Sequence, residues 1–340
     1  MEATVILIFT NTRDRFAPLV AKEIKRFGYQ CFCFDIDNYP LQNISTFRFE
    51  SGQKPEFMIG ADGRTVSLAD VTAVWYQCPE FPKFPSNLED NVQKFMTRET
   101  RHMIDSIYHL LRDKWWVNSY DSLRVAWCKP IQIAAAERVG LKTPQTLMTN
   151  DPLEAELFFE RCTRDIIYKS FSNFACLEGG SVRAIYTTHV SRSKFNELRD
   201  SIALTPCLLQ EKITKRMEYR ITVMGDDLFT CGIDSQTNEL TSVDWRRGDQ
   251  AVAVPYRMCD LPQAIVGKIK DLMRHLNLGF GCIDMIETPD GEFVFLEINP
   301  NGQFHFVEER TGFPLTNKFV AFLLNGATRQ SHPASGAYSN

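Results

Sequence analysis

Apolar and polar positions divide the first part of the chain into expected strands and helices. An apolar run at residues 4–9 precedes an amphipathic stretch at 17–28, which Gly28 closes, and a second apolar run at 31–37. Strand, helix and strand in this order predict the β-α-β start of an open α/β domain. Three later alternating segments are expected to continue the same sheet, and they cover residues 46–51, 56–62 and 70–77.

The segment after the first expected strand excludes one common use of such a domain. Residues 11–16 read NTRDRF, where a dinucleotide-binding domain carries Gly-x-Gly-x-x-Gly. We therefore expect that the open α/β domain is not a cofactor site by itself.

The pattern farther along predicts a second α/β unit and a hairpin-rich C-terminal part. Residues 122–140 are expected to form a helix that Pro130 breaks or kinks. A length of 340 residues exceeds a typical single core, so several domains are expected. The predicted division is an N-terminal α/β domain at 1–119, a central α/β domain at 120–208, a C-terminal domain at 209–325 and a disordered tail at 326–340.

Composition excludes several classes of protein. Hydrophobic residues make up 44% and charged residues 24%, as in an ordinary soluble protein, and a net charge of −4 argues against a general nucleic-acid binder. No apolar run approaches membrane-spanning length. The ten cysteines show no paired C-x-x-C spacing, which favours a reduced, cytoplasmic compartment.

Two apolar segments near the C-terminus carry oxygen-bearing side chains at a spacing that suits magnesium. Residues 279–288 and 292–300 flank the turn residues Pro289, Asp290 and Gly291, which predicts a β-hairpin. Glu297 and Asn299 are two residues apart, so both side chains leave the same face of a strand. Asp284 is expected to lie across from them. Carboxylate and amide oxygens are the ligands that magnesium prefers, so the three residues Asp284, Glu297 and Asn299 are the predicted metal ligands.

Cationic side chains suited to phosphate occur elsewhere in the chain. Lys169 lies in the apolar strand IIYKSF, just before a loop that contains Gly179 and Gly180, whose backbone amides could approach phosphate oxygens closely. Taken alone, a lysine at a strand end is equally a solvated surface group. The same ambiguity holds for Lys129. Arg220 and Arg246 could each brace phosphoryl oxygens, but each is as consistent with a structural salt bridge.

The order of these features resembles the ATP-grasp superfamily over nearly the whole chain. The resemblance rests on two lysines, a glycine-bearing loop, a QEKI hinge, an E-x-R strand and a final D…E-x-N. It implies an ATP-grasp fold of mixed α/β class, with an N-terminal open α/β domain, a central α/β domain and a C-terminal antiparallel-sheet domain. It also implies that Glu211 and Ile213 bind the adenine of ATP. The remaining implied roles are phosphate binding by Lys129 and Lys169, two magnesium ions at Asp284, Glu297 and Asn299, and contact with the transferring group by Arg220 and Arg246.

Several segments narrow the resemblance to the graspetide (microviridin-type) peptide ligases. They are AVWYQ, KPIQIAAAERVGLKTPQTLMTN, QEKITKRMEYRITVMG, SVDWRRG and FLEINPNGQF. The family implies an ATP-dependent macrocyclase that converts Asp or Glu side chains of a ribosomally made precursor peptide into acyl phosphates. A Thr or Ser hydroxyl then gives an ω-ester, or a Lys amine gives an ω-amide. A leader segment on the precursor and a homodimer belong to the same expectation. Because water would hydrolyse an acyl phosphate, the loop at residues 171–181 is the expected lid.

Two other functions stay open on the sequence. One is a RimK-like ATP-dependent ligase that adds amino acids to a protein or a small molecule. The other is a nucleotide-binding module without catalysis, against which the complete trio of oxygen ligands and both lysines argue. No residue stands out as the general base, because His305 is flanked by two phenylalanines and is expected to be a packed side chain.

Overall fold

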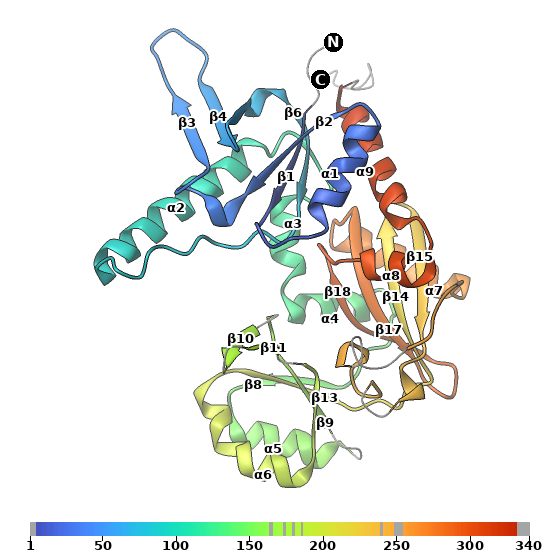
Figure 1. The fold of residues 1–340 in the computed structure, drawn as a ribbon. Coiled ribbons are helices and arrows are strands. Elements are labelled where there is room, and N and C mark those ends of the chain that lie inside the picture. The colour runs from blue at the N-terminus through green and yellow to red at the C-terminus, as the bar shows by residue number, and fades with distance from the viewer. Residues whose placement is uncertain are drawn as a thin grey trace, which may run out of the picture.

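Four parallel strands, in the order β2-β1-β6-β7, form the sheet of the N-terminal domain in the computed structural model of the chain (Figure 1). The strands are β1 (Val5–Thr10), β2 (Gln30–Asp35), β6 (Val71–Tyr76) and β7 (Trp115–Trp116). Helix α1 (Ala17–Arg26) covers one face with the C-terminal helix α9, and α2 (Asp90–Leu110) covers the other. The structure describes residues 5–162, 166–172, 175–178, 181–184, 186–238, 241–247 and 254–331.

The expectation that residues 46–51 and 56–62 continue this sheet is wrong. They lie in a separate antiparallel sheet of β3 (Ile44–Arg48), β4 (Glu56–Ala61) and β5 (Arg64–Ser67). Asp62 and Gly63 have φ of 52° and 70°, so the turn between β4 and β5 closes a local hairpin. Because β4 finds partners on both sides within this segment, only β6 returns to pair with β1.

The central domain holds an antiparallel sheet in the order β12-β9-β13-β8. Its elements are β8 (Thr146–Thr149), α5 (Pro152–Arg161), β9 (Ile166–Lys169), β12 (Thr188–Val190), α6 (Arg192–Leu198) and β13 (Cys207–Glu211). Asp151 caps α5 by accepting a hydrogen bond from the backbone amide of Leu153 at 2.8 Å, and proline begins the helix. Helices α5 and α6 pack on one face of this sheet.

A second short hairpin stands beside the central sheet. Strands β10 (Ala175–Glu178) and β11 (Ser181–Ala184) pair antiparallel, and β10 lies in the segment 171–181 that we expected to be a lid. Gly179 and Gly180, the phosphate-loop glycines of the prediction, lie outside the described residues.

The C-terminal domain is a five-stranded antiparallel sheet in the order β16-β15-β14-β17-β18. Its strands are β14 (Met217–Met224), β15 (Asp227–Ile233), β16 (Tyr256–Cys259), β17 (Phe280–Glu287) and β18 (Phe293–Asn299). Helices α4 (Lys129–Arg138) and α7 (Gln263–His275) cover one face, while α8 (His305–Thr311) and α9 (Leu315–Ser331) lie on the other. The short helix α3 (Tyr120–Ala126) precedes α4, so the helix expected at residues 122–140 is interrupted just before Pro130.

Helix α9 corrects the expected start of the disordered tail. Residues 326–331 belong to this helix, which runs beside α1 on the N-terminal domain (Figure 1) and carries the buried side chains of Leu323 and Ala327. Burial of that apolar stripe outweighs the breaker residues that suggested disorder. Residues 332–340 lie outside the described residues, and the other domain boundaries stay predictions.

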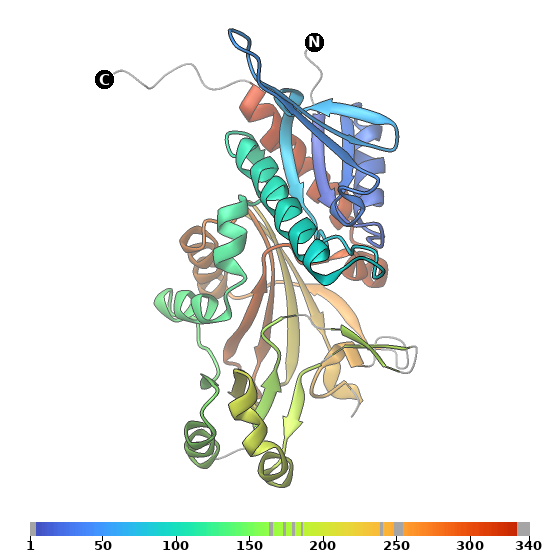
Figure 2. The same cartoon turned by 90° about the vertical axis from the view of Figure 1, so that its left-hand side faces the viewer.

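The view in Figure 2 shows the N-terminal domain above the C-terminal sheet, with the central domain below. Among the described residues, no helix is long and apolar enough to cross a membrane.

Candidate active site

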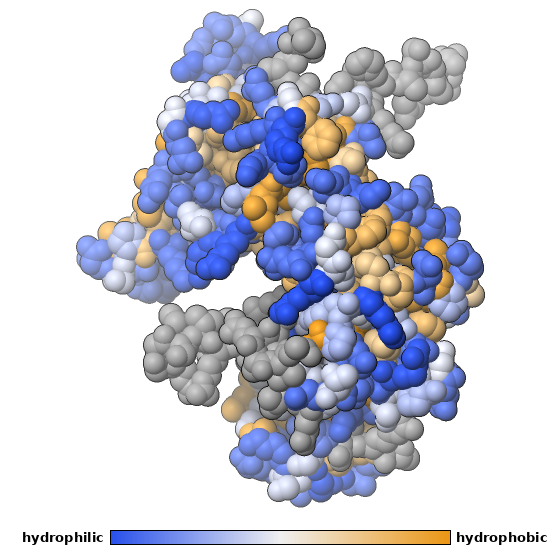
Figure 3. Space-filling view, turned by 45° about the vertical axis from the view of Figure 1, so that its right-hand side comes forward, coloured by the Kyte–Doolittle hydropathy of each residue, from blue (hydrophilic) through white to orange (hydrophobic). Residues whose placement is uncertain are grey.

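A cavity of about 600 Å³ lies between the central sheet and the C-terminal sheet. On the face shown in Figure 3 the surface is hollowed between the domains, and hydrophilic residues gather around the hollow. The cavity is lined by the nine side chains predicted to bind ATP, metal or the phosphoryl group, namely Lys129, Lys169, Glu211, Ile213, Arg220, Arg246, Asp284, Glu297 and Asn299.

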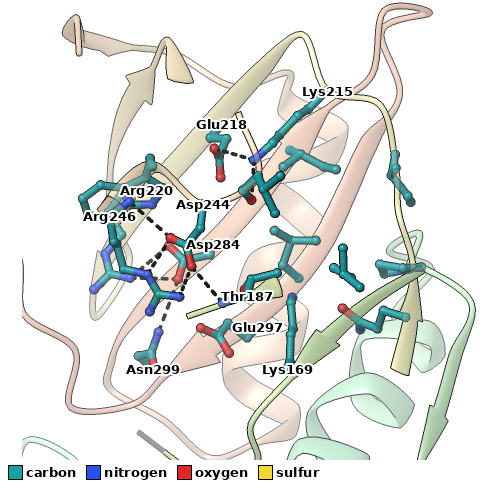
Figure 4. A pocket seen from close by; sticks show the side chains of 18 of the residues that line it. Lys169, Thr187, Lys215, Glu218, Arg220, Asp244, Arg246, Asp284, Glu297 and Asn299 are labelled. Atoms are coloured by element: carbon teal, nitrogen blue, oxygen red, sulfur yellow. Dashed lines mark hydrogen bonds and ion pairs between the residues drawn. The ribbon is translucent and has the colours of Figure 1, made fainter. Parts of the chain in front are cut away.

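Strand pairing brings the predicted metal ligands together. In the register of β17 and β18, Asp284 lies directly opposite Glu297, and Asn299 lies opposite Cys282. The register shifts beside Asp284, so Leu296 is the extra residue of a bulge. Figure 4 shows the three side chains on the same side of the hairpin, with Asn299 Nδ2 at 3.3 Å from Asp284 Oδ2.

Arg220 neutralises Asp284 from the neighbouring strand. The two residues are register partners on β14 and β17, and Nη1 of Arg220 donates to Oδ1 and Oδ2 of Asp284 at 2.9 and 3.0 Å. Nη2 donates to the carbonyl oxygen of Gln303 at 2.8 Å, while Nε is buried without a partner among the described residues. Burial raises the pKa of Asp284, and repulsion by Glu297 adds to the rise, although Arg220 opposes it.

Two lysines approach Glu297. Lys129, the first residue of α4, donates from Nζ to Oε2 of Glu297 at 2.6 Å. Burial alone would raise the pKa of Glu297, but Lys129 and Lys169 more than offset it and hold that pKa well below its usual range. Burial also lowers the pKa of Lys169, at the end of β9. The two lysines therefore balance the charge of Glu297, which favours its ionised form.

Arg246 is held by a buried carboxylate. Asp244, 4% exposed, accepts hydrogen bonds from Nε and Nη2 of Arg246 at 2.8 and 2.7 Å and one from the backbone amide of Thr187 at 3.2 Å. Burial opposes ionisation of Asp244, but the hydrogen bonds from Arg246 prevail and lower its pKa. Because Thr187 belongs to the central domain, this carboxylate also joins the two walls of the cavity. In Figure 4 Arg246 lies close to Asp284.

The hinge also lines the cavity, together with apolar side chains. Glu211 ends β13, Ile213 stands two residues later, and the backbone amide of Glu211 donates to the carbonyl oxygen of Gln145 at 2.9 Å. The apolar side chains come from both sheets and are Ile167, Ile286 and Leu296. Apolar walls with a few polar backbone groups suit a flat heterocycle.

The sequence reading passed over a buried ion pair beside the hinge. Lys215 Nζ donates to Oε1 of Glu218 at 2.6 Å and to the carbonyl oxygen of Val243 at 3.1 Å, and both charged side chains line the cavity. Burial raises the pKa of Glu218. The signal was present, because Glu218 is the acidic residue of the E-x-R motif and stands two residues before Arg220, on the same face of β14.

His305 lies outside the cavity lining. Its ring centroid is 5.6 Å from that of Phe16, and its nitrogens approach Glu308 and Glu309 at 3.7 and 3.4 Å. These contacts make it a packed residue at the start of α8, as the sequence suggested.

The chain is similar to a known protein family and to several solved enzyme structures. Residues 5–124 match the family described as the MvdD pre-ATP grasp domain. A RiPP-associated ATP-grasp ligase of Chryseobacterium gregarium, solved with ADP and a leader and core peptide, is 30% identical, with a TM-score of 0.84 over 96% of this chain and 98% of that one. No curated protein matches this chain.

Two proteins of Microcystis aeruginosa MRC are also similar. The macrocyclase MdnC, solved with the precursor peptide MdnA, is 29% identical, with a TM-score of 0.83 over 95% of this chain and 100% of that one. The macrocyclase MdnB is 26% identical, with a TM-score of 0.79 over 94% of this chain and 99% of that one.

The mixed α/β fold and the charged cleft between two antiparallel sheets define an ATP-grasp enzyme, which is an ATP-dependent ligase. Within that class, the chain belongs to the RiPP-associated ATP-grasp ligases, the graspetide or microviridin-type family.

Proposed function

We propose that this ligase is a macrocyclase of a ribosomally made precursor peptide, which it closes by joining Asp or Glu side chains to Thr or Ser hydroxyls or to Lys amines. The observation that carries the proposal is the convergence of two carboxylates, one amide, two lysines and two arginines in a single cavity. The peptides named with MdnC and with the Chryseobacterium gregarium ligase support a peptide substrate for this chain.

In this proposal the adenine of ATP lies at the hinge, among the apolar side chains of the cavity. The backbone of Glu211 and Ile213 would hydrogen-bond the adenine edge, and the ribose would lie beside Glu218. Lys129 and Lys169 lie near Glu297 and would hold the phosphates. Two lysines are suited to this role because they supply point charges with several donors each.

Asp284, Glu297 and Asn299 fit a magnesium site by the chemistry of their donor atoms. Oxygen ligands on facing strands suit this ion, which takes its other ligands from water and phosphates. We assign two ions to this site. Bound magnesium would offset the charge between the phosphates of ATP and the acid being activated.

The arginines are suited to the transferring group. The γ-phosphoryl group of ATP would pass to a side-chain carboxylate of the peptide, which gives an acyl phosphate and ADP. The hydroxyl or amine then attacks the acyl carbon, loses its proton, and inorganic phosphate leaves. Arg246 and Arg220 would face the phosphoryl and acyl oxygens, whose negative charge grows during each step. The segment at residues 171–181, which contains β10, is the proposed lid that excludes water from the acyl phosphate.

The proposed partners are a precursor peptide with a leader segment and a second copy of the chain. The enzyme would act in the cytoplasm, in keeping with the free thiol state of the nine described cysteines. Light scattering at several protein concentrations tests the homodimer.

The direct test of function is the intact mass of the precursor encoded beside this protein, after incubation with ATP and magnesium. Each ring formed removes one water from the peptide and releases one ADP. Glu297→Gln is the matched control, and it should fold but leave the peptide unchanged. A mass gain would instead identify a RimK-like ligase that adds amino acids, and an unchanged peptide with the native enzyme would reject the macrocyclase.

A further inference from the structure

The strand that carries two of the predicted metal ligands is an edge strand. Among the described residues, β17 is the one strand that pairs with β18, whose outer side has an isolated bridge between Val294 and Lys142 farther back along the strand. Ile298 lies between Glu297 and Asn299 with its side chain in the core at 1% exposure. The backbone amide and carbonyl of Ile298 point away from β17 and have no neighbouring strand. An edge strand is free to slip or fray, and a slip of one residue would turn both ligand side chains to the opposite face.

A side chain from α4 takes the place of the missing strand. Gln132, 4% exposed, accepts a hydrogen bond from the backbone amide of Ile298 at 3.1 Å. Its Nε2 donates to the carbonyl oxygens of Ile298 at 2.9 Å and Ala126 at 2.6 Å. One primary amide thus bonds both free backbone groups of the residue between the two ligands. Lys129, one helical turn earlier, reaches Glu297 from the same helix.

A second buried amide fastens the chain on the other side of Asn299. Nδ2 of Asn118 donates to the carbonyl oxygens of Pro300 at 2.6 Å and Phe280 at 2.9 Å. Its Oδ1 accepts from the backbone amides of Gly279 and Phe280 at 2.8 and 3.0 Å. Asn118 therefore ties the exit of β18 to the start of β17, and both of its polar atoms are fully used.

We propose that Gln132 and Asn118 are positioning residues of the metal site, which fix the backbone on either side of Asn299 so that Glu297 and Asn299 face Asp284. The inference rests on the proposed function, because it concerns the same three ligands. Neither amide lines the cavity, so each acts through the backbone of the ligand strand. Both residues lie between β7 and the end of α4, in the part of the chain that leads from the parallel sheet to the central sheet. This segment therefore controls the geometry of the ligands.

The test measures binding rather than turnover. Calorimetric titration of ADP into the whole protein, with and without Mn²⁺ and without peptide, gives the metal-dependent part of nucleotide affinity. Gln132→Met keeps the size of the side chain and removes all three hydrogen bonds. We expect it to lower the metal-dependent affinity about tenfold, as is typical when a group that orients metal ligands is lost, and to leave ADP binding without metal unchanged.

A matched control comes from the N-terminal domain. Asn43 is also buried, at 3% exposure, and donates to the carbonyl oxygen of Asp35 at 2.7 Å. Asn43→Leu should lower stability while keeping the native metal dependence. If Gln132→Met does not fold, Gln132→Glu and Asn118→Asp replace it, because each keeps the accepting oxygen and loses the donor.

Folded variants of Gln132 and Asn118 with native metal-dependent affinity would overturn the proposal. A native protein whose ADP affinity does not respond to Mn²⁺ would reject the proposed metal site itself, so the two failures are distinguishable.

Discussion

At the scale of single residues, the site is an arrangement of opposite charges brought close by strand register. Arg220 meets Asp284, Lys129 meets Glu297 and Arg246 meets Asp244. Arg220 and Asp244 are buried, and Lys129 and Glu297 are partly buried, so loss of one partner leaves a poorly solvated charge without compensation. These pairs therefore serve stability as well as chemistry, and their removal has effects that binding and denaturation experiments can separate.

Glu297→Gln should destabilise the protein without ligands by about 2 kcal/mol at neutral pH, because Lys129 and Lys169 lose their carboxylate. The pKa of Glu297 is depressed in the folded state. Its stabilising contribution is therefore present above the unfolded value of 4.5 and is lost as pH falls through the folded pKa. Urea unfolding of both proteins from pH 7 to pH 3 measures the difference, which should shrink below about pH 4.5.

The exposed Glu56, paired with Arg48, offers a control for that experiment. Glu56→Gln should change stability little at any pH. A difference between native protein and Glu297→Gln that stays constant with pH would show that the Glu297 carboxylate does not stabilise the fold.

Asp244→Asn should lower turnover about 100-fold, because the amide cannot hold both donors of Arg246 and the guanidinium loses its fixed position. We expect kcat to fall more than the KM for ATP rises, since Asp244 holds Arg246, which is proposed to contact the transferring group. Steady-state ADP release in the presence of precursor measures both. A rise in the KM for ATP with an unchanged kcat would contradict a role of Asp244 in the transfer step.

At the scale of elements, the hairpin of β17 and β18, which carries the proposed metal ligands, depends on its turn. Gly291 has a φ of +80° with open space where a Cβ would stand, so it is required for its backbone conformation and not for room. The opposite case is Gly267 within α7, which also has open space around it and has no positive φ.

Replacement of these two glycines by alanine should change the stability of the protein in opposite directions. Gly291→Ala should destabilise the protein by about 1 kcal/mol because alanine is strained in the left-handed region. Gly267→Ala should stabilise it by about 0.8 kcal/mol through helix propensity. Thermal unfolding of the two variants beside the native protein checks both signs, and equal shifts would contradict the reasoning.

At the scale of the whole molecule, the N-terminal and C-terminal domains share one apolar core. It joins Trp75 of the parallel sheet, Phe280 of the C-terminal sheet, and Phe304 and Phe319 beside them. The chain thus leaves the N-terminal domain, builds the other two, and returns to it with α9. The family match covers residues 5–124 and therefore does not include α9.

Truncation before α9, at residue 314, should therefore expose the face of the parallel sheet that Val320 and Leu323 cover and should give insoluble protein. Truncation after Ser331 should leave stability unchanged, because α9 stays complete. The soluble fraction after expression and the thermal midpoint of each protein are the measurements. A soluble, folded protein ending at residue 314 would contradict the shared core.

The sequence determined local structure and residue chemistry. The turn at Asp62 and Gly63, the proline-led start of α5 and the hairpin of Asp284, Glu297 and Asn299 could all be predicted, because alternation, turn residues and caps act over a few positions. The series of motifs also predicted the ATP-grasp fold and the ligase family.

Only the tertiary structure decided which distant groups meet. It assigned residues 46–62 to a sheet of their own, extended α9 to Ser331, brought Asp244 to the cavity and joined Gln132 to the strand that carries Glu297 and Asn299. Each of these depends on pairing or burial between segments far apart in the chain, and a single sequence carries no local signal for such contacts. The chemistry of each side chain is a property of the sequence, whereas its partner is a property of the fold.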